Sequence, residues 1–379
     1  MVERWWLLYS QKLGKDIVIT PNNSPITHVT IVGKLIISQP EDRMKLTRLA
    51  WSFKRVVEFM VREIISNRGV QEAVKRHHNV LPNYVYLESA YKHAKLIVEG
   101  CKRNNGNPRH VHVRKLFVIS RGNRFDKGNR NIKLVPKGKF FEVHIKYPWG
   151  NSWLVCKAVF GEKYVPLLKE LVILTERRVE SYEAKIVFRR KRIELHVSIP
   201  LQLYLKYFSK TKPKGYGLLA GFDLNSDRIN MVVIDENGRI ITLRTEWFPE
   251  VTLHGYSRHK AKNTRLKALK KLLLHARRIG VDYVVFENLL TVKKNRRKRK
   301  LRSPHANRKK GKFAKKQLII HGILMSLKLG LTPILINPKG TTHSKEHGEA
   351  MKRRGLYKHM ASAYIIAYRD LKIIRNNEK

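Results

Sequence analysis

Acidic residues are scarce in this chain. Its 379 residues include 79 lysines and arginines but only 29 aspartates and glutamates, which gives a formal net charge of +50. An excess of this size destabilises a compact state by self-repulsion unless a polyanion is bound. Nucleic acid is the partner that the charge favours, because each phosphate contact made by Lys or Arg releases condensed counterions.

The chain also lacks the features of secreted and membrane proteins. Its two cysteines, Cys101 and Cys156, cannot form a disulfide framework. No apolar run reaches the roughly 18 residues of a transmembrane helix, and the apolar start is too short for a signal peptide. With no lipidation signal either, we expect no membrane partner and a place in the prokaryotic cytoplasm, near the nucleoid.

Hydrophobic periodicity divides the N-terminal half into a β-rich domain and a helical insertion. A hydrophobic fraction of 42% is ample for packed cores. Apolar residues alternate with period two in 1–40 and 105–205, which predicts a barrel-like β-domain. Residues 41–104 show the three- and four-residue spacing of amphipathic helices. The basic, Pro- and Gly-containing segment 206–215 is expected to be a linker.

Residues 216–379 follow the order β-β-β-α-β-α-β-α. The second and third strands are joined through Asn237-Gly238, a strong hairpin signal. This order predicts an RNase-H-like α/β domain with a five-stranded mixed sheet. A doubly wound nucleotide binder is disfavoured, because no glycine-rich phosphate loop follows the first strand.

Two acids stand at the ends of apolar strands in this domain. Asp223 follows GLLAGF and Glu287 follows VDYVVF. A carboxylate at a buried position is costly unless it binds a metal or another cation, and ligands bind at the carboxyl edge of open α/β sheets. Either acid alone is equally explained as a solvated strand end. Together on neighbouring strands, they would suit two Mg²⁺ ions, which prefer oxygen ligands.

Several segments resemble one family in order and spacing. GFDLN, VVFENL and GLYKHMASAYIIAYRDL are similar to the three RuvC motifs of the transposon-encoded TnpB/OrfB proteins, which are related to type V CRISPR effectors. RFDKGNRNIKL (124–134) resembles part of that family's N-terminal wedge domain. The similarity is good over residues 216–371. Over residues 30–200 it is weaker and lies more in the arrangement of the domains than in the sequence.

The resemblance implies an α+β multidomain fold, with a wedge domain, a helical recognition insertion and a C-terminal RuvC nuclease domain. It implies an RNA-guided DNA endonuclease whose partners are a guide RNA and a target DNA, with pairing supplying the sequence. The implied cofactor is Mg²⁺ or Mn²⁺. Asp223, Glu287 and His359 are the implied catalytic and metal-binding residues.

Two departures from the family pattern bear on activity. His359 stands where the third motif has an acid, and a neutral imidazole is a poorer Mg²⁺ ligand than a carboxylate. The alternative for this residue is an ordinary helix histidine. No cysteine follows Cys156, so the two Cys-x-x-Cys pairs of a zinc ribbon are missing and no zinc is expected.

A basic insertion, 291–316, follows Glu287 directly. No acid occurs between Asn288 and Lys345. We expect phosphate contacts here and on the basic helix 257–279, although a nonspecific basic patch is the alternative for the insertion. The predicted nucleic-acid-binding residues are Arg258, Lys262, Arg265, Lys293, Arg296, Arg297, Arg299, Arg302, Lys309 and Lys312.

Two other functions stay open at this point. A catalytically degenerate protein would bind DNA under RNA guidance without cutting, as His359 and the missing ribbon suggest. An unguided RuvC-like resolvase would need only the C-terminal half, which leaves some 200 N-terminal residues unexplained.

Overall fold

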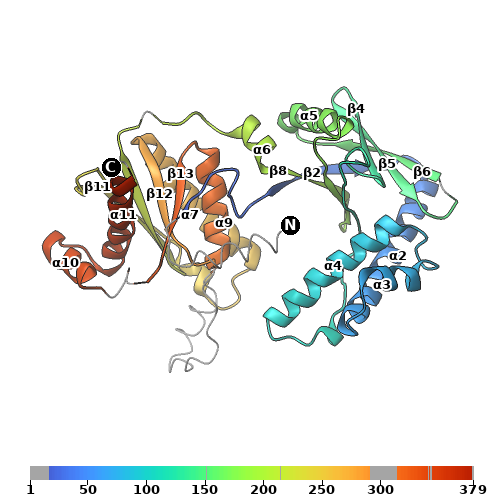
Figure 1. The fold of residues 1–379 in the computed structure, drawn as a ribbon, viewed down its shortest axis with the longest axis horizontal. Coiled ribbons are helices and arrows are strands. Elements are labelled where there is room, and N and C mark those ends of the chain that lie inside the picture. The colour runs from blue at the N-terminus through green and yellow to red at the C-terminus, as the bar shows by residue number, and fades with distance from the viewer. Residues whose placement is uncertain are drawn as a thin grey trace. The chain divides into compact units, whose positions relative to one another are not determined.

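A computed structural model describes residues 17–150, 152–213, 215–290, 314–339, 341 and 344–377, with side chains up to Leu371. The chain forms two compact units. One combines the segment up to Thr27 with the chain from Phe208 onward, and the other is His28–Tyr207. Each unit contains one β-sheet (Figure 1).

The N-terminal unit is built on a seven-stranded antiparallel sheet in the order β3-β7-β8-β2-β6-β5-β4. Alternate residues of each hairpin are buried, as the period-two pattern predicts. Among the described strands, the end strands β3 and β4 are not paired with each other, so the ladder does not close into the expected barrel. The strands are β2 (His28–Ile36), β3 (Phe117–Ser120), β4 (Ile132–Lys137), β5 (Phe140–Tyr147), β6 (Ser152–Val159), β7 (Glu183–Phe188) and β8 (Ile193–Pro200).

The expected helical insertion lies between β2 and β3. Helix α2 (Pro40–Ile65) begins at a proline with two acids in its first turn, and α3 (Val70–His77) follows it. Helix α4 (Tyr84–Arg103) is capped by Asn83, whose side chain accepts from the Tyr86 amide at 3.0 Å. Helix α5 (Val165–Glu176) joins β6 to β7, and α6 (Leu201–Phe208) covers the start of the expected linker.

The C-terminal unit contains a mixed sheet in the order β1-β13-β12-β9-β10-β11. The predicted succession of three antiparallel strands and then two parallel ones is confirmed. The sheet has six strands rather than the expected five, because Ile17–Val18, which we assigned to the N-terminal domain, pairs with the edge strand β13. The strands are β1 (Ile17–Val18), β9 (Leu218–Leu224), β10 (Arg228–Ile234), β11 (Ile240–Trp247), β12 (Val281–Glu287) and β13 (Thr332–Ile336).

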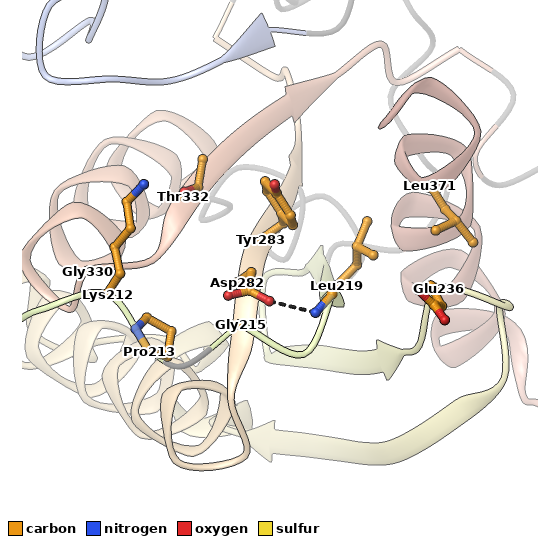
Figure 2. A pocket seen from close by; sticks show the side chains of 11 residues that line it. Lys212, Pro213, Gly215, Leu219, Glu236, Asp282, Tyr283, Gly330, Thr332 and Leu371 are labelled. Carbon is orange, nitrogen blue, oxygen red and sulfur yellow. Dashed lines mark hydrogen bonds between the residues drawn. The ribbon is translucent and has the colours of Figure 1, made fainter. Parts of the chain in front are cut away.

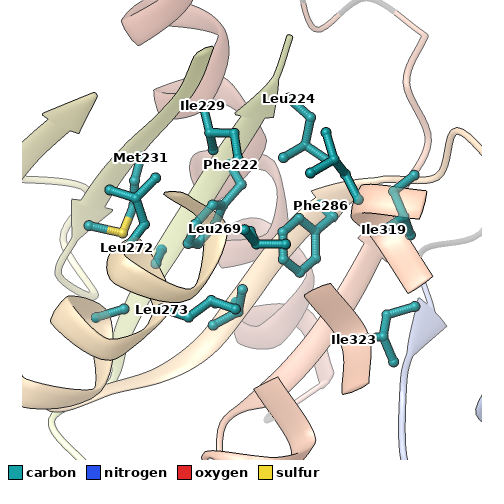
Figure 3. Packing of buried hydrophobic residues seen from close by; sticks show 14 of the residues in the cluster. Phe222, Leu224, Ile229, Met231, Leu269, Leu272, Leu273, Phe286, Ile319 and Ile323 are labelled. Atoms are coloured by element: carbon teal, nitrogen blue, oxygen red, sulfur yellow. The ribbon is translucent and has the colours of Figure 1, made fainter. Parts of the chain in front are cut away.

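Helices cover both faces of this sheet (Figure 1). On one face, Phe222 and Phe286 lie with ring centroids 5.0 Å apart beneath α7 (Arg258–Arg278) and α9 (Lys315–Lys328), as Figure 3 shows. Helix α11 (Lys358–Asn377) packs on the other face over Leu219 and Val285. Where a loop was expected before α11, residues Lys345–Arg354 form α10, which is capped by Ser344. None of the described helices is long and apolar enough to cross a membrane.

Candidate active site

Strand register brings Asp223 and Glu287 together. Strands β9 and β12 are parallel neighbours, and Phe222 pairs with Phe286. The next residue on each strand is the acid, so both carboxylates stand at the same carboxyl edge. Both also lie on the face of the sheet that α11 covers, because the phenylalanines before them point to the opposite face. The sequence-predicted pair is therefore an adjacent pair in the fold.

A glycine lets α11 approach this edge. A Cβ on Gly221 would lie 2.2 Å from the Ala363 carbonyl oxygen and 2.6 Å from the Ala367 nitrogen, so no other residue fits there. His359 lies one helical turn before Ala363 on the same face of α11. The close approach therefore carries His359 to the carboxylate pair, where its Nδ1 lies 3.0 Å from Asp223 Oδ2.

The contacts around His359 favour one tautomer. The Arg228 guanidinium lies 3.4 Å from Nε2 and can only donate, so Nε2 accepts. Nδ1 is then assigned as the donor of the shorter hydrogen bond to the Asp223 carboxylate, and the Asn225 amide, 3.4 Å from Nδ1, donates to Asp223 instead. This tautomer is assigned from the surrounding donors and acceptors. Asp223 Oδ2 also accepts from Asn225 Nδ2 at 2.7 Å, so the carboxylate is fixed from two sides.

Aromatic residues hold the groups beyond His359. The Arg228 guanidinium stacks over the Trp247 ring, 4.3 Å from its centroid. Tyr357 lies edge-on to the His359 ring, and its hydroxyl accepts from the buried Asn230 amide at 2.6 Å. These contacts orient the imidazole and the arginine before any substrate arrives.

Glu287 has a different environment from that of Asp223. Its carboxylate accepts a hydrogen bond from the Thr341 hydroxyl, which lies in the loop after β13. Burial raises the pKa of Glu287, the Thr341 bond opposes that rise, and the charge of Asp223 adds to it. More distant cations, Lys315 and Arg369, lower the pKa. Within the protein, the ionised form of Glu287 is thus disfavoured, and a bound cation would favour it.

The residues fit a metal ion as a partial ligand set. Among the described residues, no three His, Cys, Asp or Glu side chains form a group that could hold a metal by themselves. Mg²⁺ in proteins, however, commonly takes one or two carboxylates and completes its shell with water and substrate phosphates. Asp223 and Glu287 supply that pair. Ligation through His359 would require one of its present hydrogen bonds to open.

A separate cavity of this unit lies away from the carboxylate pair. A cavity of about 510 Å³ is lined by Asp282, Tyr283, Glu236 and their neighbours (Figure 2). Asp282 accepts from the Gly217 amide at 2.9 Å, at the opposite end of β12 from Glu287. Five residue-to-residue steps of about 3.3 Å along the strand separate the two acids by roughly 16 Å. The carboxylate pair therefore does not line this cavity.

The predicted nucleic-acid contacts are only partly within the described residues. On α7, Arg258 is exposed and Lys262 is partly exposed. Arg265 is instead 5% exposed in the core, where burial lowers its pKa, so it does not face a phosphate. The remaining seven, Lys293, Arg296, Arg297, Arg299, Arg302, Lys309 and Lys312, lie outside the described residues.

Sequence reasoning missed four residues of the site: Asn225, Arg228, Thr341 and Tyr357. Thr341 had a usable signal, since it follows a parallel strand at the same carboxyl edge as Glu287. Arg228 opens the strand antiparallel to β9, so its place beside the end of β9 follows once that pairing is known. Nothing local marks Tyr357 as a partner of Asn230.

Comparison with known proteins gives relatives of similar length. A family model described as SSO2105 N-terminal domain matches residues 28–209, nearly the bounds of the N-terminal unit. An uncharacterized protein, SSO2105, of Saccharolobus solfataricus is 47% identical over 351 residues, covering 92% of this chain and 93% of that protein. An uncharacterized protein of Aeropyrum pernix is 28% identical over 313 residues, covering 78% of this chain and 81% of its own.

Solved structures with similarity to this chain include two complexes. A Cas12f1–sgRNA–target DNA complex has a TM-score of 0.47 at 10% identity, over 87% of this chain and 83% of that chain. T. thermophilus RuvC in complex with a Holliday junction substrate has a TM-score of 0.31 at 14% identity, over 42% of this chain and 96% of that chain.

Proposed function

The chain belongs to the SSO2105 family, and we propose that it is a metal-dependent nuclease whose active site is the Asp223–Glu287 edge. The observation that carries the proposal is the pairing of two carboxylates at the ends of adjacent parallel strands, where Glu287 accepts a hydrogen bond from the Thr341 hydroxyl. Such a pair repels itself and becomes favourable when a divalent cation binds.

The metal would be Mg²⁺ or Mn²⁺, held by Asp223 and Glu287. When bound, it would polarise a phosphodiester and stabilise the charge that develops on the phosphate oxygens. His359 is the third member of the site. With its Nδ1 directed to Asp223, it keeps that carboxylate oriented, and its Nε2 lies next to the Arg228 guanidinium.

We propose nucleic acid as the substrate because of the charge of the chain. A net charge of +50 favours a polyanion, and Arg258 on α7 is exposed to solvent beside the sheet that carries the site. The finer proposal is RNA-guided cleavage of DNA. It is supported by the resemblance of GFDLN, VVFENL and the segment around His359 to the motifs of TnpB/OrfB proteins.

One observation favours a second candidate, a guided DNA-binding protein that does not cut. His359 replaces the expected third acid, and both of its ring nitrogens already have hydrogen-bond partners. In that case the protein binds DNA through its RNA without nicking it at any concentration of divalent metal.

The test begins with the RNA that copurifies with the full chain when it is expressed with its flanking locus. DNA that matches this RNA is then incubated with the complex and Mg²⁺. We expect cleavage, and we expect Asp223→Ala to lower it by about a thousandfold, because loss of a metal ligand removes several kcal/mol of stabilisation.

The matched control is Asp282→Ala, which removes an acid from the opposite end of β12. It should leave cleavage unchanged. Equal cleavage by Asp223→Ala and the unmodified protein would overturn the site. RNA-dependent DNA binding without cleavage would establish the second candidate, and a smear of unrelated RNA would argue against guidance.

A further inference from the structure

A second site of interest lies in the N-terminal unit, beside the exposed ends of β4, β5 and β6. A cavity of about 430 Å³ is bounded there by these strands and by the loop that precedes β4. Two aromatic residues line it. Phe125 is 80% exposed, and Trp153 is 38% exposed. Its volume lies within the roughly 300–1,000 Å³ range of ligand pockets.

The loop that carries Phe125 is held in a fixed shape by buried groups. Asn129 is fully buried; its Oδ1 accepts from the Ser120 hydroxyl and the amides of Asn131 and Ile132, and its Nδ2 donates to the carbonyls of Ser120 and Tyr182. Gly128 takes a left-handed conformation (φ 88°), which a residue with a side chain rarely adopts. These contacts therefore fix the loop in a shape that leaves Phe125 exposed.

A second contact fixes the loop to the helical insertion. The side chains of Asn83 and Asn131 form two reciprocal hydrogen bonds, at 3.1 and 3.0 Å, and Asn83 also caps α4. Both asparagines line the cavity. The floor of the cavity is thus preorganised, and binding there would cost little ordering entropy.

The lining is strongly basic. The Nζ atoms of Lys133 and Lys146 lie 5.3 and 5.1 Å from the centroid of the Trp153 ring. Five cationic residues and one acid, Asp126, line the cavity, and Asp126 forms an ion pair with Arg130. These cations are Lys127, Arg130, Lys133, Lys146 and Arg178.

We propose that this cavity binds an unpaired nucleotide of a single-stranded nucleic acid, with its base stacked on Trp153 or Phe125 and its flanking phosphates next to Lys133 and Lys146. An exposed aromatic surface within a basic groove is the arrangement that recognises single strands, because every base has a face to stack. Paired bases inside a duplex cannot enter such a cavity. The proposal rests on the proposed function only in taking nucleic acid as the partner.

The experiment measures the affinity of the full chain, stripped of bound nucleic acid at high salt, for end-labelled oligonucleotides at one fixed salt concentration. The probes are a single-stranded RNA, the DNA of the same sequence, and a duplex of that sequence. We expect Phe125→Ala and Trp153→Ala each to weaken single-strand binding by about tenfold and to leave duplex binding within about twofold.

Trp51→Ala is the matched control. Trp51 is 50% exposed on α2 of the same unit and also has a lysine over its ring, at 4.9 Å, but it lies outside the cavity. This variant should bind all probes like the unmodified protein. Trp153→Phe should restore single-strand binding, and thermal unfolding of each variant tests its folding. The tighter of the RNA and DNA probes identifies the natural strand.

Two results would overturn the proposal. One is unchanged single-strand affinity in both cavity variants. The other is an equal loss for single-stranded and duplex probes, which would mean that only charge or structure had changed. Neither result bears on the nuclease, because binding is measured without cleavage. Conversely, an Asp223→Ala protein that still requires Phe125 for single-strand binding would leave the cavity site standing even if no cleavage were found.

Discussion

Two glutamates, one in each compact unit, lie in opposite surroundings. Glu194 in the N-terminal unit is 5% exposed and is bonded by His196, Arg189 and Arg192, which lower its pKa to about 2. Glu287 in the C-terminal unit is bonded by a threonine hydroxyl and stands beside a second acid, and its pKa is raised. The first carboxylate is bonded by cations of its own hairpin, whereas the second shares its strand edge with Asp223, and a bound divalent cation would offset the repulsion between the two acids.

The comparison separates stability from function. Hydrogen bonds to charged groups within one hairpin stabilise the fold, and they occur in proteins of every function. A strand-end acid next to another acid costs stability, and such a cost is typical of sites where chemistry occurs. The two glutamates should therefore respond in opposite ways to the same change, glutamate to glutamine.

The largest expected effect is on cleavage. Glu287→Gln removes a proposed metal-binding charge and should lower the rate of Mg²⁺-dependent cleavage by about a thousandfold. Glu194→Gln, the matched control, should cut at the unmodified rate per folded molecule. Single-turnover cleavage of labelled DNA measures both. Cleavage by Glu287→Gln within about twofold of the unmodified rate would contradict the proposed role of Glu287 in metal binding.

The next effect is on stability. Glu194→Gln weakens the hydrogen bonds from His196, Arg189 and Arg192 and should lower the free energy of unfolding by about 2 kcal/mol near pH 7. The pKa of Glu194 in the folded protein is lowered from its ordinary value of 4.5, so this stabilisation is present above about pH 4.5 and is lost as the pH falls toward 2. Denaturant unfolding at neutral and acidic pH tests this, and a difference between the proteins that does not shrink in acid would contradict it.

A smaller effect is expected at the third member of the site. His359→Gln removes the imidazole that orients Asp223, and loss of such an outer partner typically costs about 10- to 100-fold in activity. The exposed His254, changed to Gln, serves as the control for a histidine elsewhere in the same unit. If His359→Gln cut as well as the control, Asp223 would be oriented sufficiently by Asn225.

The smallest expected effect is on stability at Glu287, and its sign is opposite to that of the effect at Glu194. Because the folded-state pKa of Glu287 is raised, its contribution to stability is greatest below about pH 4.5 and is lost as the pH rises through the folded value. Glu287→Gln should therefore stabilise the metal-free protein near neutral pH by about 1 kcal/mol. Added Mg²⁺ should stabilise the unmodified protein and not the variant. Thermal unfolding with and without Mg²⁺ would show whether either expectation fails.

Much of the C-terminal unit was predictable from sequence because its signals are local. Apolar runs and an Asn-Gly turn identified the strands, and their order identified the mixed sheet. Asp223 and Glu287 could be recognised as a pair because parallel neighbours end at the same edge. His359 required more, since only the resemblance to known motifs singled it out from other helix histidines.

Hydrophobic periodicity could not predict which distant segments of the chain pack or pair with each other. Ile17–Val18 joins β13 across more than 300 residues, and no local pattern distinguishes that partner from a strand of the N-terminal sheet. Arg265 has the composition of a phosphate contact, yet the stripe of α7 that faces the sheet includes it. Phe125 and Trp153 line the same cavity because the loop that carries Phe125 is fixed by the buried Asn129.

The sequence by itself determined the charge, the order of elements and the two strand-end acids, because each depends on residues close together in the chain. Tertiary structure decided the surroundings of those acids. It placed Gly221 under α11 so that His359 reaches Asp223, and it set Glu287 beside Asp223 with a hydrogen bond from the Thr341 hydroxyl. The physical reason is that a pKa, a hydrogen bond and a cavity depend on distances through space, which the fold sets and sequence spacing does not.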